Sequence, residues 1–196
     1  MFTPVGQDCL DQLFLQARSH NGWADDPVGE DLIRRLYEVL KFGPTSANAS
    51  PARFVFLTSE AGKQRLAPHV SDGNRPKMLQ APCTVIIGHD LDFPPTLTRL
   101  FPHDPTAPSW FADPAVAAYE AMRSGTLQGG YLLLAARALG LETGPMGGFD
   151  RDAVDRAFFA GTNVKSNFLC SLGKGTDHRL FPRLPRLDFD EACRIV

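Results

Sequence analysis

Residues 129–151 read GGYLLLAARALGLETGPMGGFDR, and this stretch predicts a buried helix, a strand and a glycine-rich turn in succession. Between Gly129 and Gly140 apolar side chains occupy nearly every side of the helix, which is typical of a helix inside a core. The helical pattern begins near residue 114, and Ser124 and Gly125 are its weakest point. We expect an extended segment at 141–143, a turn over GPMGGFD and a helix at 151–159.

The flanking sequence predicts helices and strands in loose alternation. Helical periodicity indicates helices at 7–18, 28–43 and 60–67, and the first of them has Leu10, Leu13, Phe14 and Ala17 on one face. Short apolar runs predict strands at 54–57, 84–88 and 168–172. We therefore expect one domain over residues 1–196, in the α/β or the α+β class.

Two segments fit neither pattern. Residues 92–109 are rich in proline and lack periodicity, which favours a functional cover over the site. The C-terminal sequence LFPRLPRLDFDEACRIV is apolar enough to need burial, yet its prolines prevent a single helix. It could wrap its own domain or cross onto a second subunit, and we favour an exchanged arm in a symmetric dimer.

Composition excludes several classes of partner. Hydrophobic residues make up 43% of the chain, and 20 basic against 22 acidic side chains give a formal charge of −2. This balance gives no electrostatic footprint for nucleic acid or an anionic membrane. No apolar run approaches the roughly 18 residues of a membrane span, and the first residues lack the basic start of a secretory signal.

Familiar catalytic motifs are missing from the sequence. It contains no G-x-G-x-x-G after a strand, no phosphate-binding P-loop and no G-x-S-x-G. The five histidines are scattered, so we expect no metal site. The four cysteines have no metal-binding or disulfide spacing and most have apolar neighbours, which favours a reducing compartment, the cytoplasm.

Several short motifs, in this order, resemble the FMN-dependent nitroreductase family. They are an Arg-Ser turn after the first helix, a P-S/T-S-x-N-x-x-P loop, a helix ending A-x-x-A-L-G-L, a P-x-x-G-F turn and an L-P-R tail. The resemblance covers nearly the whole chain. GPTSANASPARF, TGPMGGFDR and AFFAGTNVKSNFL are most similar to the malonic semialdehyde reductases of bacterial pyrimidine breakdown.

The resemblance implies an α+β sandwich, with a mostly antiparallel sheet between helices, and a homodimer that exchanges C-terminal arms. It also implies one FMN per subunit and NADH or NADPH as hydride donor. The implied reaction is a ping-pong reduction, through FMN N5, of a small carbonyl substrate such as 3-oxopropanoate to 3-hydroxypropanoate. Because the flavin carries the chemistry, no side chain need act as an acid or base.

The resemblance also assigns cofactor-binding residues. At the phosphate end it implies Arg18, Ser19, His20 and Arg186, and Arg183 competes with Arg186 in the same tail. Arginine suits this role because its planar guanidinium binds a phosphate through two parallel hydrogen bonds. Taken alone, each of these arginines would be interpreted as a surface residue.

At the ring end, Lys77 would place positive charge where reduction adds negative charge, with Asn74 one helical turn earlier. The turn at Gly147 and Gly148 would supply N–H groups to N5 and O4, and Pro145 and Met146 would pack on the ring face. Without the resemblance, these are a polar loop before a helix and an ordinary turn.

A third group implied by the resemblance reaches the flavin of the other subunit, through Pro44, Thr45, Ser46 and Asn48. Turn chemistry alone could also explain this loop. For a substrate carboxylate we name Arg123, which could equally be a structural ion pair. Phe111, with Phe101, His103 and Trp110, is expected to form an apolar lid.

Three other functions remain open from the sequence. The chain could be a broad nitroreductase or quinone reductase on the same scaffold, a flavin-binding protein without turnover, or an interaction protein without flavin. The sequence does not distinguish NADH from NADPH.

Overall fold

A computed structural model describes residues 2–196, and its centre is a four-stranded sheet. The strands are β1 (Ala52–Leu57), β2 (Cys83–Asp90), β3 (Glu142–Met146) and β4 (Val164–Gly173), in the order β1-β2-β4-β3. Every neighbouring pair is antiparallel. The α+β class is therefore confirmed, and each strand is longer than its apolar run predicted.

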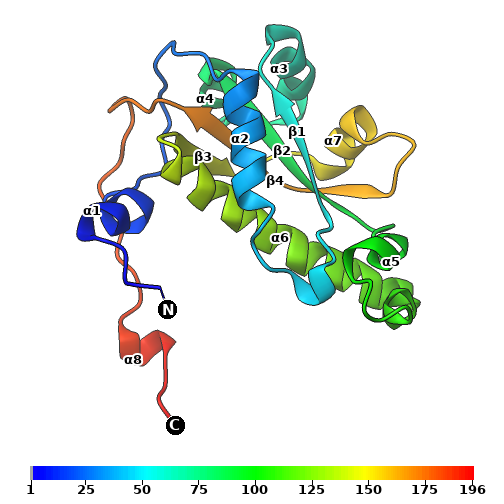
Figure 1. Ribbon diagram of the computed structural model, residues 1–196. Helices are drawn as coiled ribbons and strands as arrows, with labels where there is room; N and C mark the ends of the chain where they lie inside the picture. The colour runs from blue at the N-terminus through cyan, green and yellow to red at the C-terminus, as the bar shows by residue number, and fades with distance from the viewer. Residues whose placement is uncertain (1) are drawn as a thin grey trace.

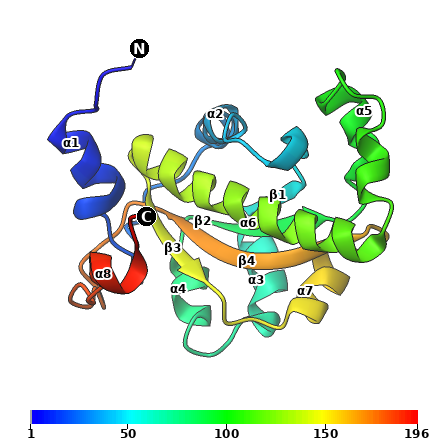
Figure 2. The same cartoon turned by 90° about the horizontal axis from the view of Figure 1, so that it is seen from below.

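Helices cover both faces of the sheet (Figure 2). On one face, α2 (Glu30–Leu40) and the long α6 (Pro114–Ala138) enclose a core with Leu36, Val85 and Leu132. On the other, α3 (Glu60–Leu66), α4 (Arg75–Gln80) and α7 (Arg151–Phe158) enclose a second core. The two layers form because β2 is apolar on both faces.

The long helix α6 is continuous, so the weak point expected at Ser124 and Gly125 does not break it. A Cβ at Gly125 would lie 2.7 Å from the Cβ of His89 on β2. The glycine therefore lets the helix backbone approach the strand, and this packing stabilises the helix where propensity alone would weaken it.

The first helix differs from its prediction. It consists of α1 (Gln7–Leu10) and a π-helical turn, η1 (Asp11–Leu15), and ends before residue 18. Its expected buried face is largely open, since Leu10 is 38% and Phe14 is 52% exposed. Within residues 2–196, this apolar face is not buried.

Residues 92–109, which the sequence predicted to be a functional cover without helical periodicity, fold into short helices. They contain η4 (Pro94–Thr96) and α5 (Leu97–Leu100) and run into η5 (Ala107–Phe111). Prolines stand at the first positions of η4 and η5, where the missing N–H costs nothing. These helices form a third core, in which Phe93, Leu97 and Ala107 pack against Ala49, Ala117 and Ala121.

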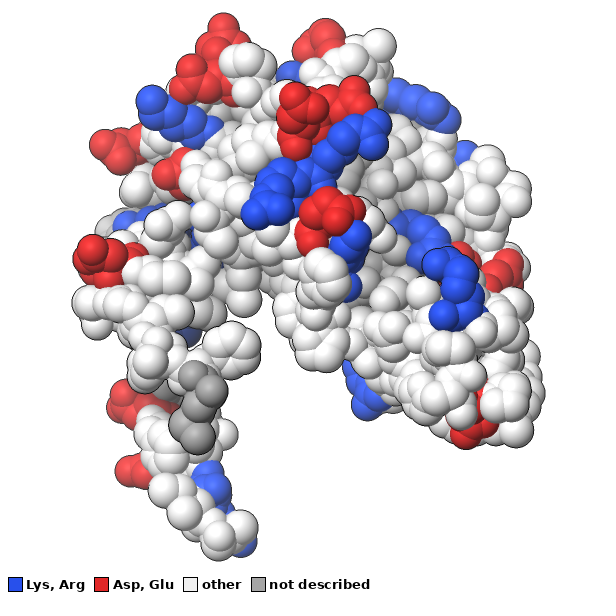
Figure 3. Space-filling model, viewed as in Figure 1, with Lys and Arg blue, Asp and Glu red and all other residues white. Residues whose placement is uncertain are grey.

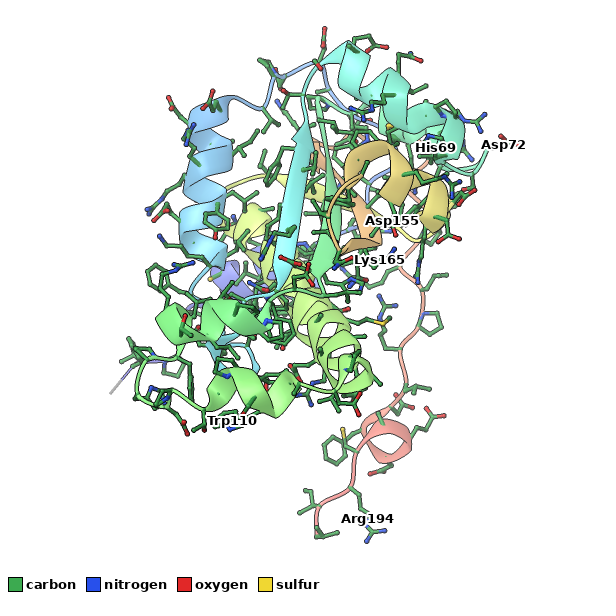
Figure 4. All side chains as sticks on the ribbon, turned by 90° about the vertical axis from the view of Figure 1, so that its right-hand side faces the viewer. His69, Asp72, Trp110, Asp155, Lys165 and Arg194 are labelled. Atoms are coloured by element: carbon green, nitrogen blue, oxygen red, sulfur yellow. The ribbon has the colours of Figure 1, made fainter. Side chains whose placement is uncertain are left out.

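After β4 the chain leaves the body as an extended tail (Figure 1). Its one short helix is α8 (Phe189–Ala192), and every residue from 181 to 196 is exposed. Figure 3 shows the end of the tail standing clear of the body, and Arg194 lies near its tip in Figure 4. Several large apolar side chains are therefore uncovered: Phe181, Leu184, Leu187, Phe189 and Ile195.

Acidic and basic side chains are interspersed on the face in Figure 3, in keeping with the small net charge. No helix among residues 2–196 combines the length and hydropathy that crossing a membrane requires. The described residues also contain no cluster of three His, Cys, Asp or Glu side chains suited to a metal ion.

Candidate functional site

The Arg-Ser turn lies beside β3. Ser19 forms a parallel bridge with Thr143, and the N–H of His20 donates to the Thr143 carbonyl at 3.0 Å. His20 is only 9% exposed, because its ring packs against Gly175 and lies 6.2 Å from the ring of Trp23. The turn is thus fixed by the sheet, and the His20 side chain serves packing, whereas Ser19 faces outward.

Asn74 and Lys77 lie together near this turn, at the N-cap and in the middle of α4. Lys77 Nζ donates to Asn21 Oδ1 at 3.0 Å, and Asn74 Nδ2 donates to the Gly148 carbonyl at 3.4 Å. A pocket of about 440 Å³ opens here. We call it the Lys77 pocket; it is lined by Asn21, Gly73, Asn74, Pro76, Lys77, Gln80, His178, Arg179 and Phe181.

Lys77 is a cation without an acidic partner. None of the ion pairs among residues 2–196 includes it. Burial lowers the pKa of Lys77 below its ordinary value, and the positive charge of Arg179 lowers it further. An anionic group in the pocket would stabilise the charged form of Lys77 and so oppose both effects on its pKa. The site therefore favours a ligand that is negatively charged or becomes so.

The glycine turn closes one side of this region. A Cβ on Gly148 would lie 2.7 Å from both Asn74 Nδ2 and Ser71 Oγ, whereas a Cβ on Gly147 would have no atom within 4 Å. The Ser71 N–H also donates to the Gly148 carbonyl at 3.0 Å. Gly148 is therefore required by close packing, and Gly147 presents open backbone.

Met146 corrects one expectation. It is only 4% exposed and belongs to the core between the sheet and α3, α4 and α7. Successive strand residues point to opposite faces, so Pro145 and Met146 cannot both pack on one ligand. Pro145, which is half-buried, is the one of the two that is left outside this core.

The tail passes beside the Arg-Ser turn. Arg18 donates to the Phe181 carbonyl, and Arg183 Nη2 donates to the carbonyls of Leu15 at 2.6 Å and Ala17 at 3.0 Å. Among residues 2–196, the hydrogen bonds of Arg186 go to carbonyls of its own segment, those of Leu184 and Pro185. Within the chain, the structure brings Arg183 close to Arg18 and does not bring Arg186 there, because the extended tail carries Arg186 onward.

The loop of residues 44–48 lies at the other end of the sheet. It precedes Ala52, which pairs with His89, whereas α4 runs into the opposite end of β2, where Thr84 pairs with Leu57. Strands of this length separate the two ends by roughly 20 Å. The loop therefore does not contact the Lys77 pocket of its own chain.

The loop conformation is strained and braced. Ala47, Asn48 and Ser50 all have positive φ, at 48°, 51° and 43°. Tyr131 donates its hydroxyl to the Pro44 carbonyl at 2.8 Å, and Asn48 Nδ2 donates to the Leu100 carbonyl at 2.8 Å. Such backbone is retained only where its surroundings hold it, and it often marks a functional segment.

The expected lid and substrate residues lie near the same end of the sheet as this loop. Phe101 packs against His103 at 3.8 Å and Trp110 at 5.6 Å between ring centres, and Phe111 packs edge-on against Phe93 at 5.0 Å. Figure 4 shows Trp110 far from His69, which lies beside α4. Residues 44–48, Phe101, Trp110 and Phe111 are the lid group.

Arg123 forms an ion pair with the buried Glu120 at 2.5 Å. The charge expected to attract a substrate carboxylate is therefore already paired. Arg99, on α5, lines a groove with Asn48 and belongs to none of the ion pairs among residues 2–196.

Sequence reasoning missed Asn21 and Arg99. Asn21 follows the Arg-Ser-His turn directly and joins it to α4 and to the tail, through the Arg179 carbonyl at 3.0 Å. The position of Asn21 beside the turn was the one sequence feature that pointed to it. Its hydrogen-bond partners, Lys77 and Arg179, are 56 and 158 positions away in the sequence.

Known proteins resemble this chain over nearly its full length. Residues 15–174 match the model of the nitroreductase family. A protein of Caulobacter vibrioides NA1000, whose name refers to NADH dehydrogenase and NAD(P)H nitroreductase activity, is 62% identical over 187 residues, covering 95% of this chain and 96% of that protein.

Solved structures share the fold at low sequence identity. A structure named as a nitroreductase in complex with FMN, from Exiguobacterium sibiricum 255-15, has a TM-score of 0.85, with 20% identity and all of both chains covered. A gut-bacterial enone reductase of fatty acid saturation has a TM-score of 0.83, with 17% identity over 98% of this chain and 100% of the other.

Proposed function

Because the chain belongs to the nitroreductase family, we propose that it is an FMN-dependent enzyme that uses NADH or NADPH to reduce a small acceptor. The observation that carries the proposal is Lys77, a half-buried cation whose hydrogen-bond partner is the neutral Asn21. It lies in a pocket lined by Asn74, whose side chain donates to the Gly148 carbonyl in the glycine turn. A flavin ring presents the matching groups, namely polar edges and a site of developing negative charge.

The residues present fit FMN. Lys77 and Asn74 would hold one edge of the ring, and the backbone of Gly147 and Gly148 would donate to the other. Arg18 and Ser19 would bind the phosphate, with Arg183 or Arg186 as the second cation. FMN bound there would supply the hydride transfer from the nicotinamide to the acceptor.

We also propose that the enzyme is a homodimer in which the lid group of one copy completes the Lys77 pocket of the other. The position of the lid group supports this. The lid group and the Lys77 pocket lie at opposite ends of the strands in one chain. The lid residues would then exclude water from the partner's site, which protects the transferred hydride.

The exposed tail supports the same assembly. The outer edge of β1 pairs with no strand among residues 2–196, and grooves of about 480 and 730 Å³ run beside it. Their apolar lining includes Tyr37, Phe42, Phe54 and Phe56. A partner's tail would cover this edge and bury Leu187 and Phe189, which are uncovered in one chain.

As substrate we propose malonic semialdehyde. In the balanced reaction, 3-oxopropanoate, NADH and a proton give 3-hydroxypropanoate and NAD⁺; the aldehyde carbon gains the hydride and its oxygen takes the proton from solvent. The substrate carboxylate needs a cation, and Arg99 is better placed than Arg123 to supply it, because Arg123 is paired with Glu120. The paired state of Arg123 equally favours an uncharged acceptor, so broad nitroarene or quinone reduction is the second candidate.

The absorption spectrum of the purified protein tests the proposal. We expect a yellow protein that is bleached by anaerobic NADH or NADPH and recovers its colour with 3-oxopropanoate. Yellow protein that the nicotinamides do not bleach would indicate flavin binding without turnover. Colourless protein that takes up no added FMN would contradict the proposal.

A comparison of acceptors tests the substrate. Under one nicotinamide, kcat/KM for 3-oxopropanoate should exceed that for a nitroarene. Arg99→Met should raise KM for 3-oxopropanoate and leave KM for the nitroarene unchanged, whereas Arg123→Met should affect neither. The reverse preference would support the broad reductase.

A further inference from the structure

Lys63 is a buried cation whose ammonium group donates to backbone carbonyls at the end of α4. Only 11% of its side chain is exposed. Its Nζ donates to the carbonyls of Leu79 at 2.7 Å and Ala81 at 3.2 Å. Its one acidic neighbour, Glu60, is 3.5 Å away and mostly exposed. Burial of an ammonium group is costly unless its N–H groups are bonded, so these two carbonyls define the position of Lys63.

The carbonyls that Lys63 binds terminate α4. The last carbonyls of a helix lack donors from the helix itself. The chain becomes extended at Ala81, and Pro82 has no N–H to offer. Lys63 therefore supplies the missing donors and places a positive charge at the negative end of the helix.

The start of α4 is held from the same segment of chain. Arg75 donates to the carbonyl of Ala67 at 2.8 Å and to that of Val70 at 2.9 Å. Figure 4 shows His69, the last residue of η3 (Ala67–His69), and Asp72, which lies on the short connection from η3 to α4. The residues of α3 and η3 thus hold α4 at both ends.

A helix as short as α4, with six residues, does not hold its own position. It carries Lys77, and Asn74 stands at its N-cap. A shift of α4 along its axis would therefore move both side chains in the Lys77 pocket together.

We propose that Lys63 is a positioning residue that fixes α4, and with it Asn74 and Lys77, against the FMN ring. The proposal rests on the proposed function, because it requires FMN in the Lys77 pocket. Lys63 does not touch the cofactor; it acts through the backbone of α4.

The test is Lys63→Met, which keeps the length of the side chain and removes the donors. We expect FMN to bind roughly tenfold more weakly, the lower end of the cost of about 10- to 100-fold for losing an orienting partner at metal sites. The midpoint potential of the bound FMN should shift negative, because Lys77 no longer faces the ring correctly. Affinity is measured by flavin fluorescence, the potential by dye-equilibration titration, and the Tm without FMN by calorimetry.

Arg65→Met is the matched control. Arg65 lies in the same helix and also donates to a backbone carbonyl, but to that of Ala157 at α7. Its guanidinium lies 4.8 Å from the ring centre of Phe158. We expect this variant to lower the Tm without changing FMN affinity or potential. Equal changes of affinity and potential in the two variants would show general destabilisation and overturn the proposal.

A double variant separates positioning from the direct field of the Lys63 charge. If Lys63 acts through Lys77, Lys63→Met should shift the potential much less in a Lys77→Met background. An equal shift in both backgrounds would mean a through-space effect and would overturn the proposal.

Lys63→Gln keeps an uncharged NH₂ group that can donate, and it is measured in the same way if the Met variant does not fold. A smaller loss of affinity in the same direction is expected, and an unchanged affinity and potential would overturn the proposal. Failure of the proposed function is recognised separately, because the wild-type protein would then bind no FMN.

Discussion

Lys77 Nζ and the side-chain oxygen of Asn21 lie 3.0 Å apart, and this hydrogen bond joins α4 to the turn that carries Arg18 and His20. An amide oxygen orients the ammonium group without neutralising its charge. The charge of Lys77 therefore remains available to a ligand, which a carboxylate in the same place would prevent.

Lys77→Met should leave FMN bound but shift its midpoint potential to more negative values. In the proposed site, the variant would remove the positive charge near the negative charge of the reduced ring, whereas the proposed phosphate contacts at Arg18 would keep the cofactor in place. Lys174→Met is the control, because the side chain of Lys174 is 73% exposed. A potential equal to that of the wild type would show that Lys77 does not face the ring.

Gly148→Ala should weaken FMN binding and lower the Tm. The new Cβ would meet Asn74 Nδ2 and Ser71 Oγ at 2.7 Å, so Asn74 must move. Overpacking of this kind costs about 1–3 kcal/mol. Gly147→Ala is the control and should retain stability, since no atom lies within 4 Å of its Cβ. Calorimetry measures the Tm of both variants, and titration measures their FMN affinity. Equal losses of Tm and FMN affinity in the two variants would contradict the prediction.

Arg18→Ala should weaken FMN binding by about 1.5–3 kcal/mol, the range for hydrogen bonds to charged groups. Without its guanidinium the phosphate loses a planar donor. Isothermal titration measures the loss, and Arg35→Ala, an exposed residue of α2, is the control. Undiminished flavin retention through gel filtration would remove Arg18 from the site.

Removal of residues 176–196 should dissociate the dimer and release FMN together. In the proposed dimer the deletion would uncover the edge of β1 in the partner. It also removes Arg183, Arg186 and the tail residues that line the Lys77 pocket, so flavin loss alone would be ambiguous. Sedimentation velocity with simultaneous detection at a flavin wavelength measures both. A truncated protein that stays dimeric and yellow would contradict the shared site.

Asn48→Gly tests the lid group without the truncation. Glycine accepts the positive φ of 51° at this position and removes the amide that binds the Leu100 carbonyl. We expect lower kcat/KM with an intact dimer by sedimentation. Unchanged activity would exclude the Asn48 side chain from the site.

The buried His89 should make the fold sensitive to acid. It is 8% exposed, its Nδ1 has no partner among residues 2–196, and burial is the main cause that lowers its pKa below the ordinary 6.5. Arg151 and Lys165 lower this pKa further, whereas Asp155 opposes them, and Figure 4 shows Asp155 near Lys165, its ion-pair partner at 3.5 Å.

The sign of the effect follows from these pKa values. As pH falls below 6.5, His89 protonates first in the unfolded chain. Its contribution to stability is therefore constant above pH 6.5 and decreases below it until His89 also protonates in the folded state. Urea unfolding between pH 7 and pH 5 measures the loss. His89→Gln should flatten this profile and His69→Gln should not. If stability depends on pH in the same way in His89→Gln and in the wild type, His89 is not the cause of the acid sensitivity.

The sequence predicted the elements whose burial follows a simple period. The helical period over residues 28–43 and the apolar run at 84–88 predicted α2 and β2, and the one-turn spacing of Asn74 and Lys77 placed these two residues together. The prediction that Met146 and Pro145 both pack on the ring face was wrong for Met146, because neighbouring strand residues point to opposite faces. The contact of Asn21 with Lys77 could not be predicted, because the two polar residues belong to no common periodic pattern and lie 56 positions apart.

The third core, around Phe93, Leu97 and Ala107, has a consequence for how related enzymes diverge. Its members belong to neither of the two cores that hold the sheet. Residues 92–113 can therefore be exchanged for another sequence while the sheet keeps its packing. Such modular exchange would alter what covers the reacting acceptor without rebuilding the cofactor pocket. Chimaeras that graft this segment from a relative should thus fold and inherit the donor's acceptor preference.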